Sequence, residues 1–255
     1  MRPKILHYCW FGNQAMPEKE LSCTSTWKKL LPDWEFKLWN EQTYDLNGSV
    51  FARQAYDKKM FAFVSDCVRA EVLYRFGGLY LDTDVELYPQ FRAILGSCRN
   101  FVGFETKRQV GTAVMAFEPR HSVIKELCEC YSGDFTRNGK MAIEANVAYL
   151  TEILQKRGLL LNRETQQIDD VMVFDREYFF PKRLDDDKFN ITEKTVAIHR
   201  CSGSWMSERQ RKRGKNFLWV KVMRPILLGM KAALKTLIGS DRTKKIENSI
   251  RNILR

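Results

Sequence analysis

Residues 77–84 read Gly-Gly-Leu-Tyr-Leu-Asp-Thr-Asp, and this stretch decides the fold. It predicts an apolar strand that ends in two carboxylates, Asp82 and Asp84, spaced i and i+2. Because side chains alternate along a strand, both carboxylates are expected on one side, with Leu79, Leu81 and Val85 on the other. The two glycines allow a tight backbone turn before the strand. The stretch therefore predicts a pair of acids at the carboxyl end of a buried strand.

Two ionised carboxylates this close repel each other unless a cation lies beside them. Mg²⁺ and Mn²⁺ take such oxygen ligands together with phosphate oxygens, so the pair predicts a metal–diphosphate site with Mn²⁺ or Mg²⁺ as cofactor. An Asp-x-Asp triplet also occurs in many surface turns that bind nothing. The sequence around the triplet therefore has to decide between the two interpretations.

The segment before the glycines predicts a helix that carries Asp66 and Arg69 on one face, since residues three apart are neighbours on a helix. At the protein surface such an ion pair contributes little to stability. The surrounding residues are apolar, however, and the helix runs directly into the Gly77-Gly78 turn. The alternative to a surface pair is a buried acid and guanidinium beside the metal carboxylates, where they would grip a ligand.

Four blocks of sequence occur together in one order. They are PKILHYCWFG at 3–12, Ser65-Asp66-x-x-Arg69, Gly77-Gly78-x-Tyr80-x-Asp82-x-Asp84, and His199-x-x-x-Gly203-Ser204-Trp205. Together they resemble the family 32 glycosyltransferases, the DXD-motif group that includes initiating α-1,6-mannosyltransferases and bacterial capsule and lipopolysaccharide enzymes. The chain is more distantly similar to the glucosyltransferase domains of large bacterial cytotoxins. The resemblance covers most of residues 1–205.

The resemblance implies roles for specific residues. The implied catalytic residues are Asp66, Arg69, Asp82 and Asp84; the implied donor-binding residues are Trp10, Ser65, Tyr80, Ser204 and Trp205; and the implied metal ligands are Asp84, Asp82 and His199. In this interpretation Asp66 and Arg69 orient the donor sugar and Trp10 stacks on the nucleobase. Ser204 and Trp205 contact the diphosphate in a mobile lid that excludes water.

Some of these residues also have a structural interpretation. Trp10 is alternatively a core residue, and His199 a packed histidine, although imidazole is a good Mn²⁺ ligand. His7 is expected to be a packed strand histidine. Arg200 and Cys201 stand where the family usually has His-Trp, which leaves the closing loop open. Residues 144–147 lack the Gly-Pro that the family carries near its acceptor, so acceptor choice does not transfer.

Periodicity predicts an α/β fold, and the resemblance specifies it as a GT-A-like, Rossmann-type mixed sheet flanked by helices. Expected strands lie at 5–10, 34–39, 79–82, 101–105, 113–117, 171–174 and 196–199, and expected helices at 21–30, 52–76, 124–131 and 141–154. At 255 residues and 44% hydrophobic, the chain can bury one sizeable core. We expect a nucleotide-sugar glycosyltransferase domain at 1–205 and a basic amphipathic helical tail at 206–255.

The charge of the chain is divided unequally between these two parts. Residues 1–205 carry 28 Lys+Arg and 28 Asp+Glu, whereas residues 206–255 carry 14 and 3, so the tail holds the whole excess of +11. In the tail Ile226, Met230, Leu234 and Leu237 recur at helical spacing beside lysines. This pattern is typical of a helix on an anionic membrane surface, which makes residues 217–255 a membrane contact. Packing against the body or a second subunit is the alternative, and central cations argue against a spanning helix.

The N-terminus and the cysteines indicate the compartment. Met1-Arg2-Pro3-Lys4 leads into only a short apolar run, so no signal peptide is expected, and we expect a cytoplasmic protein peripheral to the inner face of the membrane. Seven cysteines without a C-x-x-C pair favour buried reduced thiols over disulfides or zinc.

The sequence therefore predicts an enzyme that moves a hexose from a UDP- or GDP-linked sugar to a hydroxyl of a growing cell-surface polysaccharide or lipid-linked glycan. By resemblance the transfer retains the anomeric configuration. One alternative is a glycan hydrolase, which needs two carboxylates across the scissile bond. Another is a non-catalytic basic adaptor that binds membrane or nucleic acid through the tail. Nucleic acid is not expected as a partner, because residues 1–205 are electrically neutral.

Overall fold

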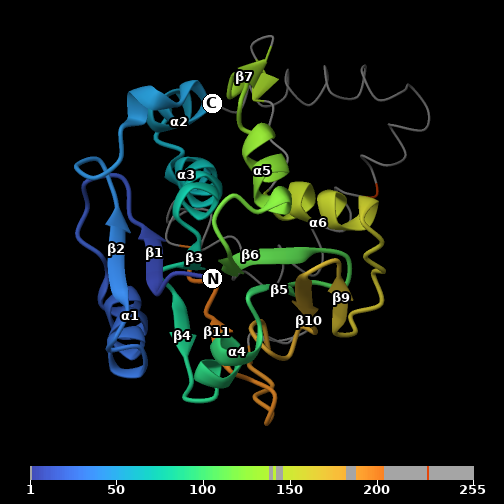
Figure 1. Cartoon of the computed structure of the whole chain (residues 1–255). Helices are drawn as coiled ribbons and strands as arrows, with labels where there is room; N and C mark the ends of the chain where they lie inside the picture. Colours follow the sequence, from blue (N-terminus) through green and yellow to red (C-terminus); the bar gives the residue numbers. More distant parts are fainter. Residues whose placement is uncertain (1, 138–139, 142–145, 182–187, 204–228, 230–255) are drawn as a thin grey trace. The chain divides into compact units, whose positions relative to one another are not determined.

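The computed structural model describes residues 2–137, 140–141, 146–181, 188–203 and 229 (Figure 1). The expected tail and the lid residues Ser204 and Trp205 lie outside these residues, and the domain boundary at 205 stays a prediction. Within the described residues, no helix has both the length and the apolar composition needed to span a bilayer.

The described residues alternate between strands and helices. The strands are β1 Ile5–Cys9, β2 Glu35–Trp39, β3 Gly78–Leu81, β4 Val85–Leu87, β5 Asn100–Phe104, β6 Val110–Phe117, β7 Thr136–Arg137, β8 Lys140–Met141, β9 Gln166–Ile168, β10 Val171–Phe174 and β11 Ala197–His199. The helices are α1 Glu18–Leu30, α2 Val50–Asp57, α3 Phe61–Phe76, α4 Phe91–Ser97, α5 Ser122–Glu129 and α6 Asn146–Lys156, with a 3-10 turn at Leu46–Gly48.

A seven-stranded mixed sheet in the order β2-β1-β3-β6-β5-β10-β9 forms the centre of the fold (Figure 1). β1 pairs in parallel with both β2 and β3, and β10 pairs in parallel with β5. β6 runs antiparallel to both β3 and β5, so these two strands point the same way. The carboxyl ends of β1, β2, β3, β5 and β10 therefore share one edge of the sheet. The expected α/β fold with a mixed sheet flanked by helices is confirmed.

Each face of the sheet is covered by its own hydrophobic core. One core joins β-strand residues such as Tyr80 to α2, α3, α5 and α6. The other joins Leu79 and Leu81 to α1, α4 and the small β4–β11 sheet. Tyr80 and its two neighbours thus lie on opposite faces, as strand alternation predicts.

The glycines that precede β3 are required by backbone geometry and by space. Gly77 and Gly78 have φ of 62° and 108°, in the region that side chains disfavour. A Cβ on Gly78 would lie 2.4 Å from the carbonyl oxygen of Ile5. Strand β3 can therefore lie against β1 only with glycine at this position.

Several boundaries differ from the expectation. The single helix expected at 52–76 is two helices, because the chain turns at Lys59, which has φ of 57°. Helix α1 begins at Glu18 rather than residue 21, with two acids in its first turn, where they favour a helix N-terminus. Helix α6 begins at Asn146 rather than 141, since Lys140–Met141 form a short strand. β4, α4 and β9 were not predicted, because each is too short to show periodicity.

All seven cysteines lie in the described residues, and none forms a disulfide. Cys9, Cys23 and Cys67 are buried, whereas Cys201 is exposed. The expectation of burial is confirmed for Cys9, Cys23 and Cys67, and the reduced state of the thiols stays a prediction.

Candidate metal and donor site

A tight turn after β3, rather than strand alternation, brings the two aspartates together. β3 ends at Leu81, and the Val85 N–H donates to the Asp82 carbonyl at 3.0 Å, which closes a turn over 82–85. Both acids lie on one side, as expected, but the strand that was expected to carry them ends before Asp82. The turn bends the chain into β4, because Val85 and Leu87 have to bury their side chains in the second core.

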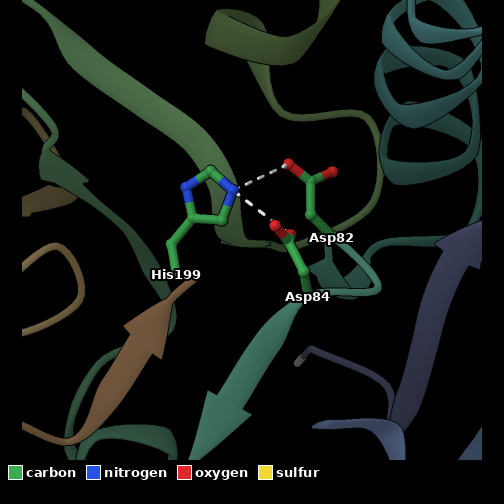
Figure 2. Close-up of side chains that lie close together, drawn as sticks. All are labelled: Asp82, Asp84 and His199. Atoms are coloured by element: carbon green, nitrogen blue, oxygen red, sulfur yellow. Dashed lines mark ion pairs between the residues drawn. The ribbon is translucent and has the colours of Figure 1, made fainter. Parts of the chain in front are cut away.

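Strand β11 delivers the third member of the site. β11 pairs antiparallel with β4 and sets His199 opposite Val85. The His199 Nε2 lies 3.2 Å from Asp84 Oδ1 and 4.0 Å from Asp82 Oδ2 (Figure 2). The ligand atoms of the three residues all lie within 4.8 Å of one another. The structure therefore brings the three sequence-predicted metal ligands into one cluster.

The charges of this cluster are tightly matched. Burial acts to raise the pKa of Asp84, but the hydrogen bond and charge of His199 and the Ser202 contacts hold that pKa well below its usual value. Burial acts to lower the pKa of His199, but Asp84 raises it well above the usual value. An imidazolium or a divalent cation can therefore balance the two carboxylates.

The donor set fits a divalent ion. Two carboxylates suit Mg²⁺ and Mn²⁺, and the imidazole nitrogen favours Mn²⁺ over the harder Mg²⁺. The exposed fraction of the side chain is 26% for Asp82, 10% for Asp84 and 15% for His199, so the cluster is open to a ligand on one side.

Arg69, on α3, holds the carboxylate of Asp82 in place. Its Nη2 lies 2.7 Å from Asp82 Oδ1, and the Tyr80 hydroxyl donates to the same oxygen at 3.1 Å. Its Nη1 donates to the carbonyl and the hydroxyl of Thr112 at 2.9 and 2.5 Å. Only 5% of the Arg69 side chain is exposed. The surface ion-pair interpretation of Asp66 and Arg69 is therefore wrong, and the guanidinium acts mainly by holding Asp82.

Asp66 lies at the same site with a different environment. It is 3.5 Å from Arg69 Nη2, and the Asn146 amide donates to its Oδ1 at 2.5 Å. Burial raises the pKa of Asp66 to about 7, against the opposing charge of Arg69. Asn146 was not predicted from the sequence, because residues 144–147 were compared only with the family's Gly-Pro. The sequence feature that could have indicated it is a lone amide side chain at the start of a helix.

Asp84 has a second set of partners that the sequence did not reveal. The Ser202 N–H donates to Asp84 Oδ2 at 2.6 Å. The Ser202 hydroxyl lies 3.0 Å from the same oxygen and 2.7 Å from Glu20 Oε1. Glu20, on α1, is 2% exposed. Asp84 Oδ2 is thus occupied by protein donors, which leaves Oδ1 toward His199.

The departures from the family pattern at Arg200 and Cys201 have clear contacts. Arg200 forms an ion pair with Glu86 on the neighbouring strand, with its Nε 3.0 Å from Oε2. The Cys201 thiol lies 3.6 Å from His199 Nδ1. These two residues therefore contact β4 and the metal ligand respectively.

The donor-binding predictions are placed as follows. Trp10 is half-buried directly after β1, and its Nε1 donates to the Gln14 carbonyl at 2.6 Å. Ser65 is half-buried on α3, one residue before Asp66. Tyr80 is 1% exposed, so its hydroxyl acts on Asp82 and Arg69 rather than on a surface ligand. His7 is fully buried, as expected of a packed strand histidine.

A further carboxylate, Glu105, comes directly after β5 at the same edge of the sheet. Burial raises its pKa; the charge of His199 opposes this, and that of Asp82 adds to it. Sequence reasoning missed this residue, although it stands at the end of a predicted strand. Parallel strand ends meet at one edge, and this rule was the signal that could have found it.

Residues 17–100 match the family described as "Glycosyltransferase sugar-binding region containing DXD motif". This stretch holds Asp66, Arg69, Asp82 and Asp84, so these four residues lie in a part of the chain that is similar to the DXD-containing sugar-binding region of glycosyltransferases. Among curated proteins the chain is 33% identical over 87 residues to inositol phosphoceramide mannosyltransferase 3 of Schizosaccharomyces pombe, over 32% of this chain and 24% of that one. It is 28% identical over 149 residues to an uncharacterized protein of Arabidopsis thaliana, over 56% of this chain and 22% of that one.

The aligned part thus spans under a quarter of the length of either curated relative. Among solved structures, the chain is similar to the PaToxG glycosyltransferase, with a TM-score of 0.49 and 16% identity over 61% of this chain and 68% of that one. It is also similar to a glycosyltransferase involved in glycosylation of the major capsid of PBCV-1, with a TM-score of 0.42 and 11% identity over 83% and 98%.

Proposed function

We propose that the chain is a metal-dependent, retaining glycosyltransferase. It moves a hexose from a UDP- or GDP-linked sugar to a hydroxyl of a growing cell-surface polysaccharide or lipid-linked glycan. The observation that carries the proposal is the convergence of Asp82 and Asp84, which lie in the matched sugar-binding region, with His199, such that their ligand atoms all lie within 4.8 Å of one another. The name of the mannosyltransferase relative supports a hexose donor and a lipid-linked acceptor.

In this proposal Asp84, Asp82 and His199 hold Mn²⁺ or Mg²⁺ against the donor's diphosphate. When bound, the ion supplies positive charge that stabilises the departing nucleoside diphosphate. Arg69 and Tyr80 hold Asp82, and Ser202 holds Asp84, so the ligand oxygens are fixed before the donor arrives. Preorganised charge of this kind costs no rearrangement during the reaction.

The donor sugar lies against α3 in this proposal. Asp66 accepts hydrogen bonds from the hydroxyls of the donor sugar, Ser65 lines the same side, and Trp10 stacks on the base. The acceptor oxygen bonds to the anomeric carbon while the bond to the diphosphate breaks, and the electron pair leaves with the diphosphate. The proton of the acceptor hydroxyl passes to the departing diphosphate oxygen on the same face. No protein nucleophile is required.

A hydrolase is less compatible with the geometry. Glycan hydrolysis needs two carboxyl groups roughly 5 to 9 Å apart on either side of the scissile bond. Asp82 and Asp84 instead gather on one histidine, 4.0 and 3.2 Å away. An adaptor function leaves these buried, matched charges without a use.

Substitution of one ligand tests the proposal. Asp84→Asn removes a negative ligand but keeps the shape, whereas Asp57→Asn changes an exposed aspartate on α2 and serves as the matched control. The measurements are Mn²⁺-dependent thermal stabilisation by UDP- and GDP-sugars, and release of nucleoside diphosphate. Asp84→Asn should abolish both, and the control should retain both. Turnover by Asp84→Asn equal to the control would contradict the proposal.

We also propose that residues 217–255 place the enzyme on the cytoplasmic face of an anionic membrane. Their basic charge and helical spacing of apolar residues support this, since each cation near such a surface contributes about 1 kcal/mol. Lipid-linked acceptors lie at that surface.

A further inference from the structure

A polar cavity of about 740 Å³ lies beside the candidate site. Its charged lining consists of Arg163, Glu164, Asp175, Arg176, Glu177 and Lys194. Phe180 forms part of its wall. None of these residues belongs to the DXD-bearing region at 17–100, and none was singled out by the sequence motifs.

The cavity adjoins the metal cluster through two contacts. The ring of Phe180 meets the ring of His199 edge-on, with centroids 5.6 Å apart. The Arg176 Nε donates to the Glu105 carbonyl oxygen at 2.7 Å, which ties the cavity to the end of β5. One wall residue of the cavity, Phe180, therefore packs against a predicted metal ligand.

Strand order sets the direction in which a donor must lie. Trp10 follows β1, Asp82 follows β3, Glu105 follows β5 and Arg176 lies two residues beyond β10, all at the carboxyl edge of the sheet. A nucleotide-sugar is linear, with its diphosphate between the base and the sugar. With the base at Trp10 and the diphosphate at Asp82, Glu105 lies on the side of the diphosphate away from the base. The next feature along that edge is the cavity.

We propose that this cavity is the acceptor subsite and that it takes the terminal sugar of a neutral glycan. The inference rests on the proposed function. It identifies the acceptor side of the site, which no sequence motif indicates. A terminal sugar in the cavity would lie on the far side of Phe180 from His199, next to the Arg176–Glu105 contact.

The balance of charges in the cavity selects a neutral ligand. Three cations face three acids there. Lys194 Nζ lies 3.3 Å from Asp175, and the Thr192 hydroxyl donates to Glu177 at 3.1 Å. In the described part of the chain, the exposed Arg163 side chain makes no hydrogen bond or ion pair. Sugar hydroxyls can donate to the acids and accept from the cations, so a neutral glycan satisfies both kinds of group.

The test measures release of nucleoside diphosphate from UDP- and GDP-hexoses with Mn²⁺. The acceptor probes are neutral methyl glycosides of mannose, glucose and galactose, with methyl glucuronide and mannose 6-phosphate as anionic probes. Arg163→Ala and Lys194→Ala alter the cavity. Lys156→Ala is the matched control, because Lys156 is also an exposed lysine paired with an acid, Glu152 at 2.9 Å. Thermal unfolding of each variant checks that it folds.

At least one neutral glycoside should accelerate release above the rate with water. Arg163→Ala and Lys194→Ala should raise the KM for that glycoside about tenfold and the KM for the donor less than twofold, whereas Lys156→Ala should change neither. Acceleration by anionic probes alone or by no probe overturns the inference, as does an unchanged glycoside KM in both variants. If the unaltered chain consumes no donor at all, the proposed function itself fails, which is a separate result.

Discussion

Arg69 binds Asp82 across 2.7 Å while keeping only 5% of its own side chain exposed. A buried guanidinium of this kind orients a carboxylate through fixed, planar donors. The first aspartate of the DXD triplet is therefore held by a residue thirteen positions earlier on α3, and the orientation of its carboxylate depends on that helix.

Arg69→Lys should weaken Mn²⁺ binding by about tenfold, because lysine keeps the charge but loses the forked contact with Thr112 and Asp82. Loss of an outer partner of a metal ligand typically costs about 10- to 100-fold in affinity. Isothermal titration with Mn²⁺ measures the change. The control is Arg75→Lys on the same helix, an exposed arginine paired with Glu71 at 3.1 Å. Equal affinities in the two variants would contradict the role given to Arg69.

His199→Ala should lower Mn²⁺ affinity more than Mg²⁺ affinity, since imidazole is the softer of the three donors. Loss of the outer partner of a metal ligand lowers metal affinity at least about tenfold, so loss of the ligand itself should lower the Mn²⁺ affinity at least as much. Competition titrations with the two ions measure the ratio. His121→Ala removes an imidazole outside the cluster and should leave the ratio unchanged. A ratio shift of the same size in both variants would count against His199 as a ligand.

His7 should make the free energy of unfolding depend on pH. Burial lowers its pKa from 6.5 to about 4; the hydrogen bond to the Gly77 carbonyl opposes this shift. The folded state thus favours neutral histidine, so its contribution is complete above pH 6.5 and is lost as pH falls toward 4. The loss amounts to roughly 3 kcal/mol.

Denaturant unfolding at several pH values between 7.5 and 4.5 checks this prediction. His7→Gln should be less stable at pH 7.5, because it loses the packed ring that accepts from Trp39 at 3.1 Å. Its free energy of unfolding should also change less steeply with pH between 7.5 and 4.5. A slope identical to that of the unaltered chain would show that His7 does not titrate as proposed.

Gly78→Ala should destabilise the fold by more than about 3 kcal/mol, since its Cβ meets the Ile5 carbonyl oxygen at 2.4 Å and its φ is 108°. Gly96→Ala is the matched control. Gly96 lies in α4 with no atom within 4 Å of an added Cβ, so alanine there should be neutral or stabilising by up to about 1 kcal/mol. The melting temperatures of the two variants should therefore move in opposite directions or differ by many degrees.

Removal of the chain after Trp205 should abolish flotation with vesicles that contain anionic lipid. The tail carries 14 Lys+Arg against 3 Asp+Glu, and such attraction weakens with salt. The full chain should float with anionic vesicles at low salt and remain in solution with neutral ones. Equal flotation of the truncated and full chains would eliminate the tail as the membrane contact.

Local sequence patterns predicted the central strands well, because buried strands are short apolar runs that turn residues interrupt. β1, β2 and β10 fall within one residue of their expected ranges. Asp82, Asp84 and His199 were also predicted to share one site, because their motifs occur in the order found in the family that the chain resembles. The turn at 82–85 was predicted as strand, because a Tyr-x-Asp-x-Asp alternation looks the same whether the chain continues straight or bends.

The missed residues share a physical reason. Asn146 reaches Asp66 across 80 positions, and Ser202 reaches Asp84 across 118 and Glu20 across 182. Contacts at such separations depend on how helices pack on the sheet, and periodicity along a short window contains no such information. Glu105 differs, because topology alone would have placed it once the strand directions were known.

The pairing of His199 with Val85 has a consequence during synthesis. The recognisable signature ends at residue 100, yet one ligand is added almost a hundred residues later. A nascent chain that has left the ribosome only as far as α6 holds two aspartates without their histidine. The three side chains can therefore come together only after β11 has emerged and paired with β4.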